Sequence, residues 1–197
     1  MESEFESYDN LPNGWVYLFQ QLRVKAKTDA GPMSVARLPI NQGRNRYRDV
    51  LPVDDTRVKL QNDENDYINA NHVMVSDVNK RYILTQGPLR QTSAHFWQMV
   101  WEQNTYGIVM LNKIIEKGML KCEPYWPATE SRSPMDHGQF KVTLKTVDKK
   151  FAYTICKLEL TNMEVYICIC MLCVPEELVH VRRVGLCMYI HGVYVCM

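Results

Sequence analysis

The residues with the greatest chemical capability in this sequence are its seven cysteines and one polar pentapeptide. A cysteine thiolate is both a nucleophile and a metal ligand, so each cysteine is a candidate for either chemistry. Residues 45–49, Asn-Arg-Tyr-Arg-Asp, bring an aromatic ring, two cations and a carboxylate into five positions. Such a stretch is most often a solvated loop, and only its sequence context can favour a functional interpretation.

Five further motifs follow this pentapeptide along the chain. They are, in order, DYINAN at 66–71, YILTQGP at 82–88, FWQMVWE at 96–102, VMLN at 109–112 and KCEPYWP at 121–127. With its motifs in this order and spacing, the chain resembles the N-terminal part of a classical protein tyrosine phosphatase domain. It is most similar to the non-receptor subfamily of small ER-associated and nuclear enzymes. The resemblance covers about residues 5–162, and six agreeing motifs are far more specific than one.

The resemblance implies hydrolysis of phosphotyrosine in proteins, and it assigns three residues to substrate binding. Tyr47 matches the ring that stacks on phosphotyrosine and sets the pocket depth, which selects a long aryl phosphate over phosphoserine. Asp49 matches a carboxylate that accepts hydrogen bonds from the substrate backbone. Arg48 matches a cation that favours acidic residues beside the phosphotyrosine. The implied partners are phosphotyrosine proteins or peptides, and the resemblance implies no cofactor and no metal.

The resemblance also implies three supporting residues. Arg23 matches a basic position at a secondary aryl-phosphate site. Lys121 matches a lysine near a mobile loop that carries the catalytic acid, and Glu116 matches a carboxylate that orients the catalytic arginine. Framework positions of the family are matched by Asn69, Gln86 and Trp97. The tryptophans at 97, 101 and 126 are expected to pack in the core.

The catalytic residues of the family find no match in this chain. The family uses a cysteine nucleophile followed six positions later by an arginine, and an aspartate in a Trp-Pro-Asp loop. None of the seven cysteines has an arginine six positions later, and Trp126-Pro127 is followed by Ala128. The catalytic set is therefore empty, and we expect the chain to be a truncated domain, inactive as written.

The apolar patterns predict the helices and strands that must position these residues. They indicate a mixed α/β fold, in which helices flank a twisted sheet. Together with the resemblance, this fold is expected to be a truncated tyrosine-phosphatase-like domain. The predicted helices cover 15–22, after a turn at 12–14, and from 92 or 93 to 103; the predicted strands are 67–70, 72–75, 81–85, 107–111, 140–144 and 156–160. The strand at 107–111 is expected to be buried on both faces. The last two strands are expected to pair antiparallel around 148–150.

Composition divides the chain near residue 162. Apolar residues make up 46% of the whole sequence, but residues 165–197 contain 24 among 33, with five of the seven cysteines. We expect residues 1–162 to be a partial tyrosine phosphatase domain and residues 163–197 to be a non-homologous, apolar, cysteine-rich, low-complexity tail. The leading hypothesis for the tail is translation of a simple dinucleotide repeat, through a retained intron, a frameshift or a gene-model error.

Other interpretations of the tail stay open. Cys168, Cys170 and Cys173 with His180 have a spacing that could bind zinc, although they lie in an apolar run rather than in polar knuckles. A membrane attachment is not expected, because the apolar run at 165–174 is too short to span a bilayer as a helix.

A third interpretation concerns the alternating residues at 165–173 and 186–197. They could add strands to the sheet. The same composition, high in β-formers and low in charge, makes the tail an aggregation hazard.

Charge and cysteine usage exclude several classes of protein. The 23 Lys and Arg residues balance 22 Asp and Glu residues, which gives no reason to expect nucleic-acid binding. The acidic N-terminus is not a signal peptide, and two cysteines in the first 164 residues are no disulfide framework. We expect a cytoplasmic protein, with ER association as the alternative.

Two further hypotheses about function stay open beside the inactive phosphatase domain. The chain could be a non-catalytic phosphotyrosine-binding fragment, or an incomplete translation of a gene for an active phosphatase. A third alternative is that the chain does not fold stably, because a partial domain exposes apolar surface and a sheet edge.

Overall fold

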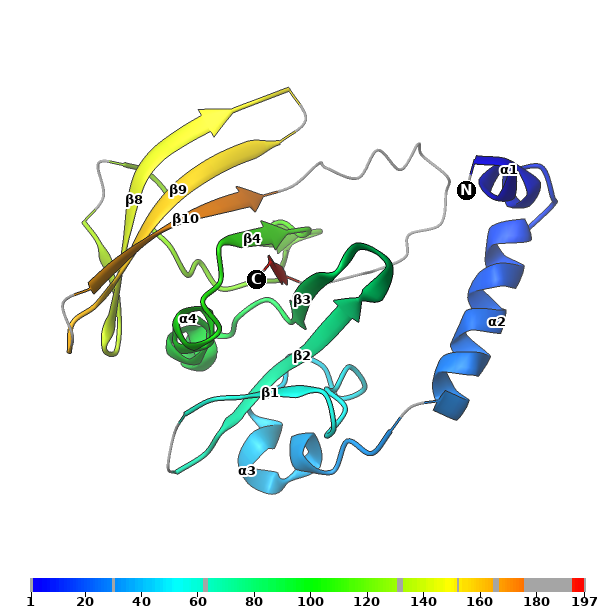
Figure 1. The fold of residues 1–197 in the computed structure, drawn as a ribbon, viewed down its shortest axis with the longest axis horizontal. Helices are drawn as coiled ribbons and strands as arrows, with labels where there is room; N and C mark the ends of the chain where they lie inside the picture. The colour runs from blue at the N-terminus through cyan, green and yellow to red at the C-terminus, as the bar shows by residue number, and fades with distance from the viewer. Residues whose placement is uncertain are drawn as a thin grey trace.

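A computed structural model describes residues 2–29, 31–61, 64–130, 133–151, 153–164, 167–175 and 193–196. The fold is mixed α/β, as the sequence predicts, with a nine-stranded sheet and few helices (Figure 1). The helices are α1 Glu2–Asp9, α2 Gly14–Asp29, α3 Pro39–Gln42 and α4 Ser93–Glu102, with 3-10 turns at Val35–Arg37, Ser76–Val78 and Arg90–Thr92. The strands are β1 Arg57–Lys59, β2 Tyr67–Val75, β3 Lys80–Thr85, β4 Gly107–Met110, β5 Ile115–Glu116, β6 Met119–Leu120, β7 Met135–His137, β8 Phe140–Lys149, β9 Thr154–Asn162, β10 Ile167–Pro175 and β11 Val193–Cys196.

The large sheet has the strand order β1-β2-β3-β11-β4-β10-β9-β8-β7. Its neighbours pair antiparallel except β4 and β10, which are parallel. The predicted antiparallel pairing of 140–144 with 156–160 is confirmed, since Val142 lies opposite Leu160 and Leu144 opposite Leu158. Period-two alternation fixes this register, because a slip by one residue would turn the apolar side chains to the opposite face.

The prediction of two strands at 67–70 and 72–75 is wrong in one respect, because β2 is a single strand of nine residues. The polar Asn71 does not interrupt it. Its side-chain amide donates to the backbone oxygen of Val53 at 3.2 Å and to the hydroxyl of Thr56 at 2.7 Å. A turn at residues 76–79 joins β2 to β3, and Asn79 adopts the left-handed conformation there with φ of 47°, which asparagine tolerates.

The core lies between the sheet and α4. The predicted helix start is confirmed, with Thr92 as the N-cap residue. The helix buries Phe96, Trp97, Met99 and Val100. Trp97 is fully buried, and its indole N–H donates to the backbone oxygen of Tyr125 at 2.9 Å. Trp101 and Trp126 pack against the same core, as expected.

Strand β4 differs from the prediction that both of its faces are buried. Ile108 and Met110 are buried, whereas Gly107 and Val109 are half-buried. The reason is that the core covers one face of the sheet at this strand, while the other face stays partly open among the residues described.

The tail contributes two strands to the sheet, as one of the open interpretations predicts. β10 lies between β9 and β4, and β11 lies between β3 and β4. His180, a residue of the suggested zinc site, lies outside the described residues. Within the described part of the chain, no three metal-ligating side chains come together, and no helix is long and apolar enough to cross a membrane.

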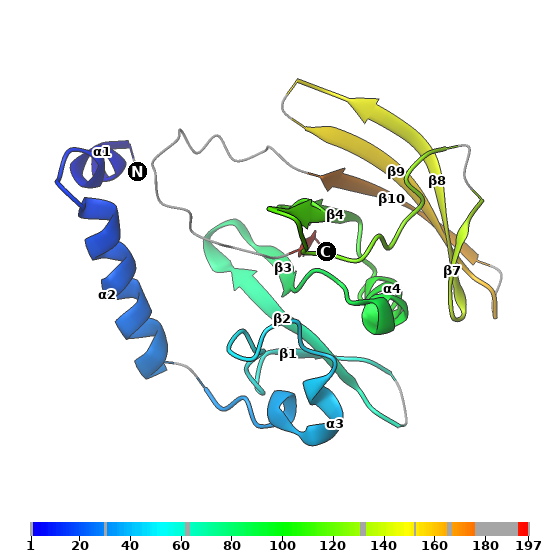
Figure 2. The ribbon, with the colours of Figure 1, turned by 180° about the vertical axis from the view of Figure 1, so that it is seen from behind.

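The predicted helix at 15–22 extends to Asp29 as α2. It begins after Asn13, whose φ of 60° is left-handed. The ring of Trp15 packs against Phe5 of α1, with ring centroids 4.9 Å apart. The apolar face does not pack fully, however, since Leu22 remains 55% exposed. Figures 1 and 2 show α1 and α2 standing beside the sheet rather than on either face.

Candidate functional site

The pentapeptide lies in a loop between α3 and β1, and residues 45–50 are called the 45–50 loop below. The side chain of Tyr47 is half-buried, while those of Arg48 and Asp49 are exposed. Residues 47–49 therefore present an aromatic ring, a cation and a carboxylate at the surface. The Tyr47 ring can stack on an aromatic ring of a ligand. The Arg48 guanidinium can pair with an anionic group of the same ligand.

Arg46 fastens the beginning of this loop to two other segments. Its guanidinium donates to the backbone oxygens of Gly87 at 3.0 Å, Pro88 at 2.7 Å and Leu120 at 3.3 Å. A planar guanidinium with several fixed donors suits three convergent carbonyl groups in a way that a lysine ammonium does not. One side chain thus joins the 45–50 loop to the loop after β3 and to strand β6.

The side chains of Asn45 and Asn69 fix the two ends of the 45–50 loop through hydrogen bonds. The side-chain oxygen of Asn45 accepts hydrogen bonds from the hydroxyl of Tyr67 and from the amide of Asn69, the latter at 3.0 Å. The Asn69 amide also donates to the backbone oxygen of Val50 at 3.0 Å. Burial raises the pKa of Tyr67 to about 12, so its hydroxyl remains a donor at neutral pH.

Gln86 closes this network on the side of the sheet. Its side-chain nitrogen donates to the backbone oxygen of Arg44 at 2.9 Å, and its side-chain oxygen accepts from the backbone N–H of Arg46 at 2.8 Å. Residues 44–46 and 50 are thereby fixed to the core. Near these anchors, the side chains of Arg48, Asp49 and Val50 are exposed and that of Tyr47 is half-buried.

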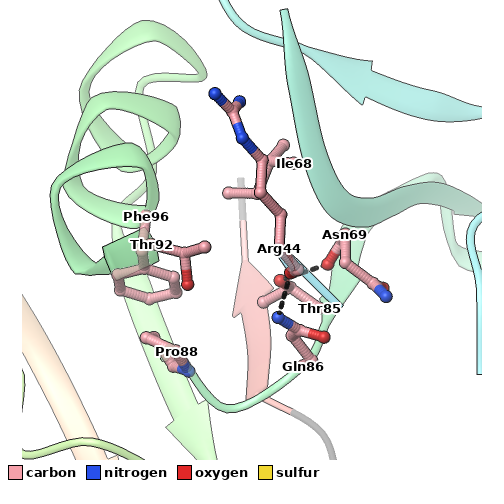
Figure 3. Close-up of a pocket in the computed structure, with 8 residues that line it drawn as sticks. All are labelled: Arg44, Ile68, Asn69, Thr85, Gln86, Pro88, Thr92 and Phe96. Atoms are coloured by element: carbon pink, nitrogen blue, oxygen red, sulfur yellow. Dashed lines mark hydrogen bonds between the residues drawn. The ribbon is translucent and has the colours of Figure 1, made fainter. Parts of the chain in front are cut away.

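A small pocket lies behind the anchored end of the loop. Figure 3 shows Phe96 of α4 and its N-cap residue Thr92 on one side, and Ile68 and Asn69 of β2 on the other. Its lining consists of Arg44, Ile68, Asn69, Thr85, Gln86, Pro88, Thr92 and Phe96. Because this lining contains no cysteine and no carboxylate, the pocket holds neither a thiolate nucleophile nor a carboxylate acid or base.

A second carboxylate fixes the chain just before the site. Asp54 accepts hydrogen bonds from the backbone N–H of Ser34 at 2.8 Å and of Val35 at 3.1 Å, and from the hydroxyl of Ser34. The Ser34 hydroxyl, together with these backbone donors, lowers the pKa of Asp54 below its usual value. Asp54 remains ionised at neutral pH as a structural anchor.

The three supporting residues lie in different places. Lys121 is half-buried and directly follows β6. The backbone oxygen of Leu120 in β6 accepts a hydrogen bond from Arg46, which connects this segment to the 45–50 loop. Glu116 lies in the β5–β6 hairpin, where its carboxylate accepts from the backbone N–H of Lys113 at 3.0 Å. Arg23 is exposed on α2, the helix that stands beside the sheet (Figure 1).

The two cysteines with described side chains are not candidates for nucleophilic catalysis. Cys122 is fully buried, and this burial raises the pKa of its thiol to about 12. Burial likewise raises the pKa of the Cys156 thiol. Both are therefore neutral core side chains at physiological pH. Gly87 packs closely against Cys122, and a Cβ atom at Gly87 would lie 2.8 Å from the backbone oxygen of Lys121.

Sequence reasoning singled out residues 47–49 of the loop but assigned no role to Asn45 and Arg46, which hold its start. Arg46 and Asn45 belong to the same pentapeptide, and their partners include Tyr67, 22 positions from Asn45, and Leu120, 74 positions from Arg46. Asn69 and Gln86 were identified as framework positions, and both are buried. A buried amide must satisfy its hydrogen bonds, so an asparagine within the apolar strand β2 and a glutamine directly after β3 were the signal that the sequence offered.

Comparison with known proteins gives one family. A family model described as protein-tyrosine phosphatase matches residues 41–167. Human tyrosine-protein phosphatase non-receptor type 2 is 46% identical over 163 residues, which are 83% of this chain and 39% of that protein. Human tyrosine-protein phosphatase non-receptor type 4 is 40% identical over 167 residues, with 83% of this chain and 18% of that protein covered. Mouse receptor-type tyrosine-protein phosphatase eta is 43% identical over 136 residues, which are 68% of this chain and 11% of that protein.

The chain thus spans well under half the length of these relatives. The matched region contains the 45–50 loop and the residues that anchor it, from Asn45 to Leu120. Because the family model covers more than half of the sequence, this chain belongs to the protein-tyrosine phosphatase family, in its classical non-receptor branch.

Proposed function

We propose that the protein acts on phosphotyrosine in proteins, and that residues 47–49 form the part of its surface that recognises the phosphotyrosine side chain. The supporting observation is the double anchoring of the 45–50 loop. Arg46 and Asn45 fix its start, and Asn69 holds the backbone oxygen of Val50 at its end. A ring whose backbone is fixed loses little conformational entropy on binding, which favours recognition.

In this proposal each of residues 47–49 has one role. The ring of Tyr47 stacks on the aryl ring of the substrate and limits the pocket depth. Asp49 accepts hydrogen bonds from the substrate backbone, and Arg48 attracts acidic residues beside the phosphotyrosine. The partners are phosphotyrosine proteins. The site of action is the cytoplasm, which is supported by the non-receptor relatives.

The chemical step needs groups outside this sequence. Since none of the seven cysteines precedes an arginine by six positions, the 197 residues supply no phosphate-binding loop with its thiolate nucleophile. We infer that residues 1–162 are the recognition half of a phosphatase domain, and that residues 163–197 are a non-homologous tail, although the match to the family model extends over the first five of them. Lys121, Glu116 and Arg23 then have supporting roles that depend on the rest of such a domain.

A chimera tests the proposed recognition surface. Residues 5–162 of this chain would replace the matched segment of human tyrosine-protein phosphatase non-receptor type 2, which supplies the catalytic residues. We expect the chimera to hydrolyse a phosphotyrosine peptide. We expect Tyr47→Ala to lower its kcat/KM roughly tenfold, mainly through KM, because lost ring stacking costs about 1.4 kcal/mol.

Tyr106→Ala is the matched control, because Tyr106 is 72% exposed and lies outside the 45–50 loop. It should leave kcat/KM unchanged. The proposal fails if a folded chimera shows no hydrolysis, or if the two tyrosine variants behave alike.

A further inference from the structure

Two histidines at α4 each carry a buried ring nitrogen that has no hydrogen-bond partner among the described residues. His95 is the third residue of α4, and His137 lies in β7 at one edge of the large sheet. The nitrogens are Nδ1 of His95 and Nε2 of His137. In a neutral imidazole one nitrogen carries no proton. Protonation turns this nitrogen into a charged donor, and burying such a donor without an acceptor is costly.

His137 lies where three segments meet. Its ring centroid is 6.4 Å from that of Trp97 on α4. Its imidazole forms a hydrogen bond to the backbone of Tyr125, and the Tyr125 oxygen also accepts from the indole N–H of Trp97 at 2.9 Å. One ring nitrogen of His137 is therefore occupied as a donor, so a second proton would have to go on the buried Nε2.

His95 lies in the first turn of α4, where two further features disfavour a positive charge. The N-terminus of a helix carries a positive partial charge, which opposes a cation in the first turn. The second feature is a neighbouring guanidinium, because burial and the charge of Arg44 both lower the pKa of His95. The imidazole is therefore neutral at pH 7.

The surroundings of His137 favour its neutral form less strongly. Burial lowers the pKa of His137, whereas the hydrogen bond to Tyr125 and the charge of Asp136 act to raise it. The side chain of Asp136 is 69% exposed and lies 3.9 Å from the ammonium group of Lys141 on β8, so solvent and this cation weaken its effect. The other neighbours are uncharged, with Trp97 on α4 and Phe140 opposite His137 on β8.

The start of α4 is also connected to the 45–50 loop. The backbone oxygen of Pro88, just before the helix, accepts from Arg46 at 2.7 Å. The backbone oxygen of Arg44 accepts from the side chain of Gln86 at 2.9 Å. Repulsion between a protonated His95 and Arg44 would therefore act on the residues that lead into this loop.

We propose that α4 is an acid-sensitive joint, in which protonation of His95 and His137 in mildly acidic solution loosens the helix from the sheet and from the 45–50 loop. Its effect on phosphotyrosine recognition rests on the proposed function of that loop. The loosening of the helix does not, because it depends only on the two imidazoles and their neighbours.

The expected pH range follows from the direction of the pKa shifts. Because both pKa values are lowered in the folded chain, the unfolded chain takes up these protons first as the pH falls. The contribution is constant above about pH 7.5 and is lost as the pH falls below about 6.5. Each proton changes the opening equilibrium by up to about tenfold per pH unit. Most carboxylates titrate below about pH 5, so the range from pH 5.5 to 7.5 isolates the histidines.

Hydrogen exchange of the 197-residue polypeptide, followed by mass spectrometry of its peptides, tests the proposal. Rates at pH 7.5 and 5.5 are first corrected for the intrinsic pH dependence of exchange. We expect the opening constant of peptides from α4 to rise at least tenfold at pH 5.5, and that of peptides from β8 and β9 to rise less. In the double variant His95→Gln and His137→Gln, the rise in α4 should be less than threefold. His72→Gln, at an exposed position of β2, should keep the full rise.

Several results would overturn the proposal. One is an opening constant of α4 in the wild-type chain that does not rise at pH 5.5, a measurement that needs no variant. Another is an equal rise in α4 and in β8 and β9, which would show general unfolding. A third is an unchanged rise in a double variant that circular dichroism shows to be folded. No phosphotyrosine ligand is used, so these results are independent of whether the chimera hydrolyses phosphotyrosine.

Discussion

Removal of the Arg46 side chain tests how the 45–50 loop is held. Its guanidinium makes two part-buried hydrogen bonds, to the backbone oxygens of Gly87 at 3.0 Å and Pro88 at 2.7 Å, and a longer exposed one to Leu120 at 3.3 Å. A hydrogen bond to a charged group contributes about 1.5–3 kcal/mol. Taking the lower part of this range for the two part-buried bonds, we expect Arg46→Ala to lower the free energy of unfolding by about 3–4 kcal/mol.

Urea unfolding followed by tryptophan fluorescence measures this loss. With a slope of about 2 kcal/mol per molar urea, the midpoint should fall by about 1.5–2 M. Arg46→Lys keeps one donor group and should lose about half as much. Arg48→Ala is the matched control, an exposed arginine two positions away, and should change stability by less than about 0.5 kcal/mol. Equal effects of Arg46→Ala and Arg48→Ala would refute the anchoring role.

Three other predictions concern the framework around the loop. The lowered pKa of Asp54 stabilises the fold above its unfolded pKa, near 4, and this contribution is lost as the pH falls through the folded value. Asp54→Asn should therefore lower the urea midpoint at pH 7, and the difference from the wild-type chain should shrink as the pH is lowered below about 4; a difference that does not change with pH would contradict this role. The thiol of Cys122, with its pKa raised to about 12, should resist iodoacetamide at pH 8 in the folded chain and should react once urea is added. Peptide mass mapping measures this labelling. Rapid labelling of Cys122 in the folded protein would contradict its burial. Gly87→Ala forces a Cβ atom to within 2.8 Å of a backbone oxygen and should cost about 1–3 kcal/mol in urea unfolding. Gly43→Ala, which meets only a flexible side chain at 3.4 Å, should be nearly neutral, and comparable losses for the two glycines would contradict this reasoning.

Local patterns in the sequence predicted those parts of the fold that depend on neighbouring residues. The alternation at 140–144 and 156–160 gave the β8–β9 pairing, because a buried face demands period two. The helix from Ser93 was predicted from its cap and its apolar face. The expected role of Tyr47 in substrate binding came from the resemblance, and the structure places its half-buried side chain in the loop between α3 and β1.

Contacts between distant segments could not be predicted in the same way. Nothing near Arg46 indicates that its partners lie 41, 42 and 74 positions further along the chain. The amphipathic pattern of α2 predicts a helix but not which surface covers it, and Leu22 is 55% exposed. Alternation in the tail allowed extra strands, but the choice of β4 and its neighbours as partners depends on which sheet edges are open.

Turnover by the 197-residue polypeptide tests most directly whether this chain carries recognition residues without the chemical ones. The purified polypeptide would be assayed with an aryl phosphate and with a phosphotyrosine peptide, each with and without vanadate. Because no cysteine precedes an arginine by six positions, we predict no vanadate-sensitive release of phosphate from either substrate. Vanadate-sensitive turnover that persists after further purification would contradict the assignment of catalysis to residues outside this sequence.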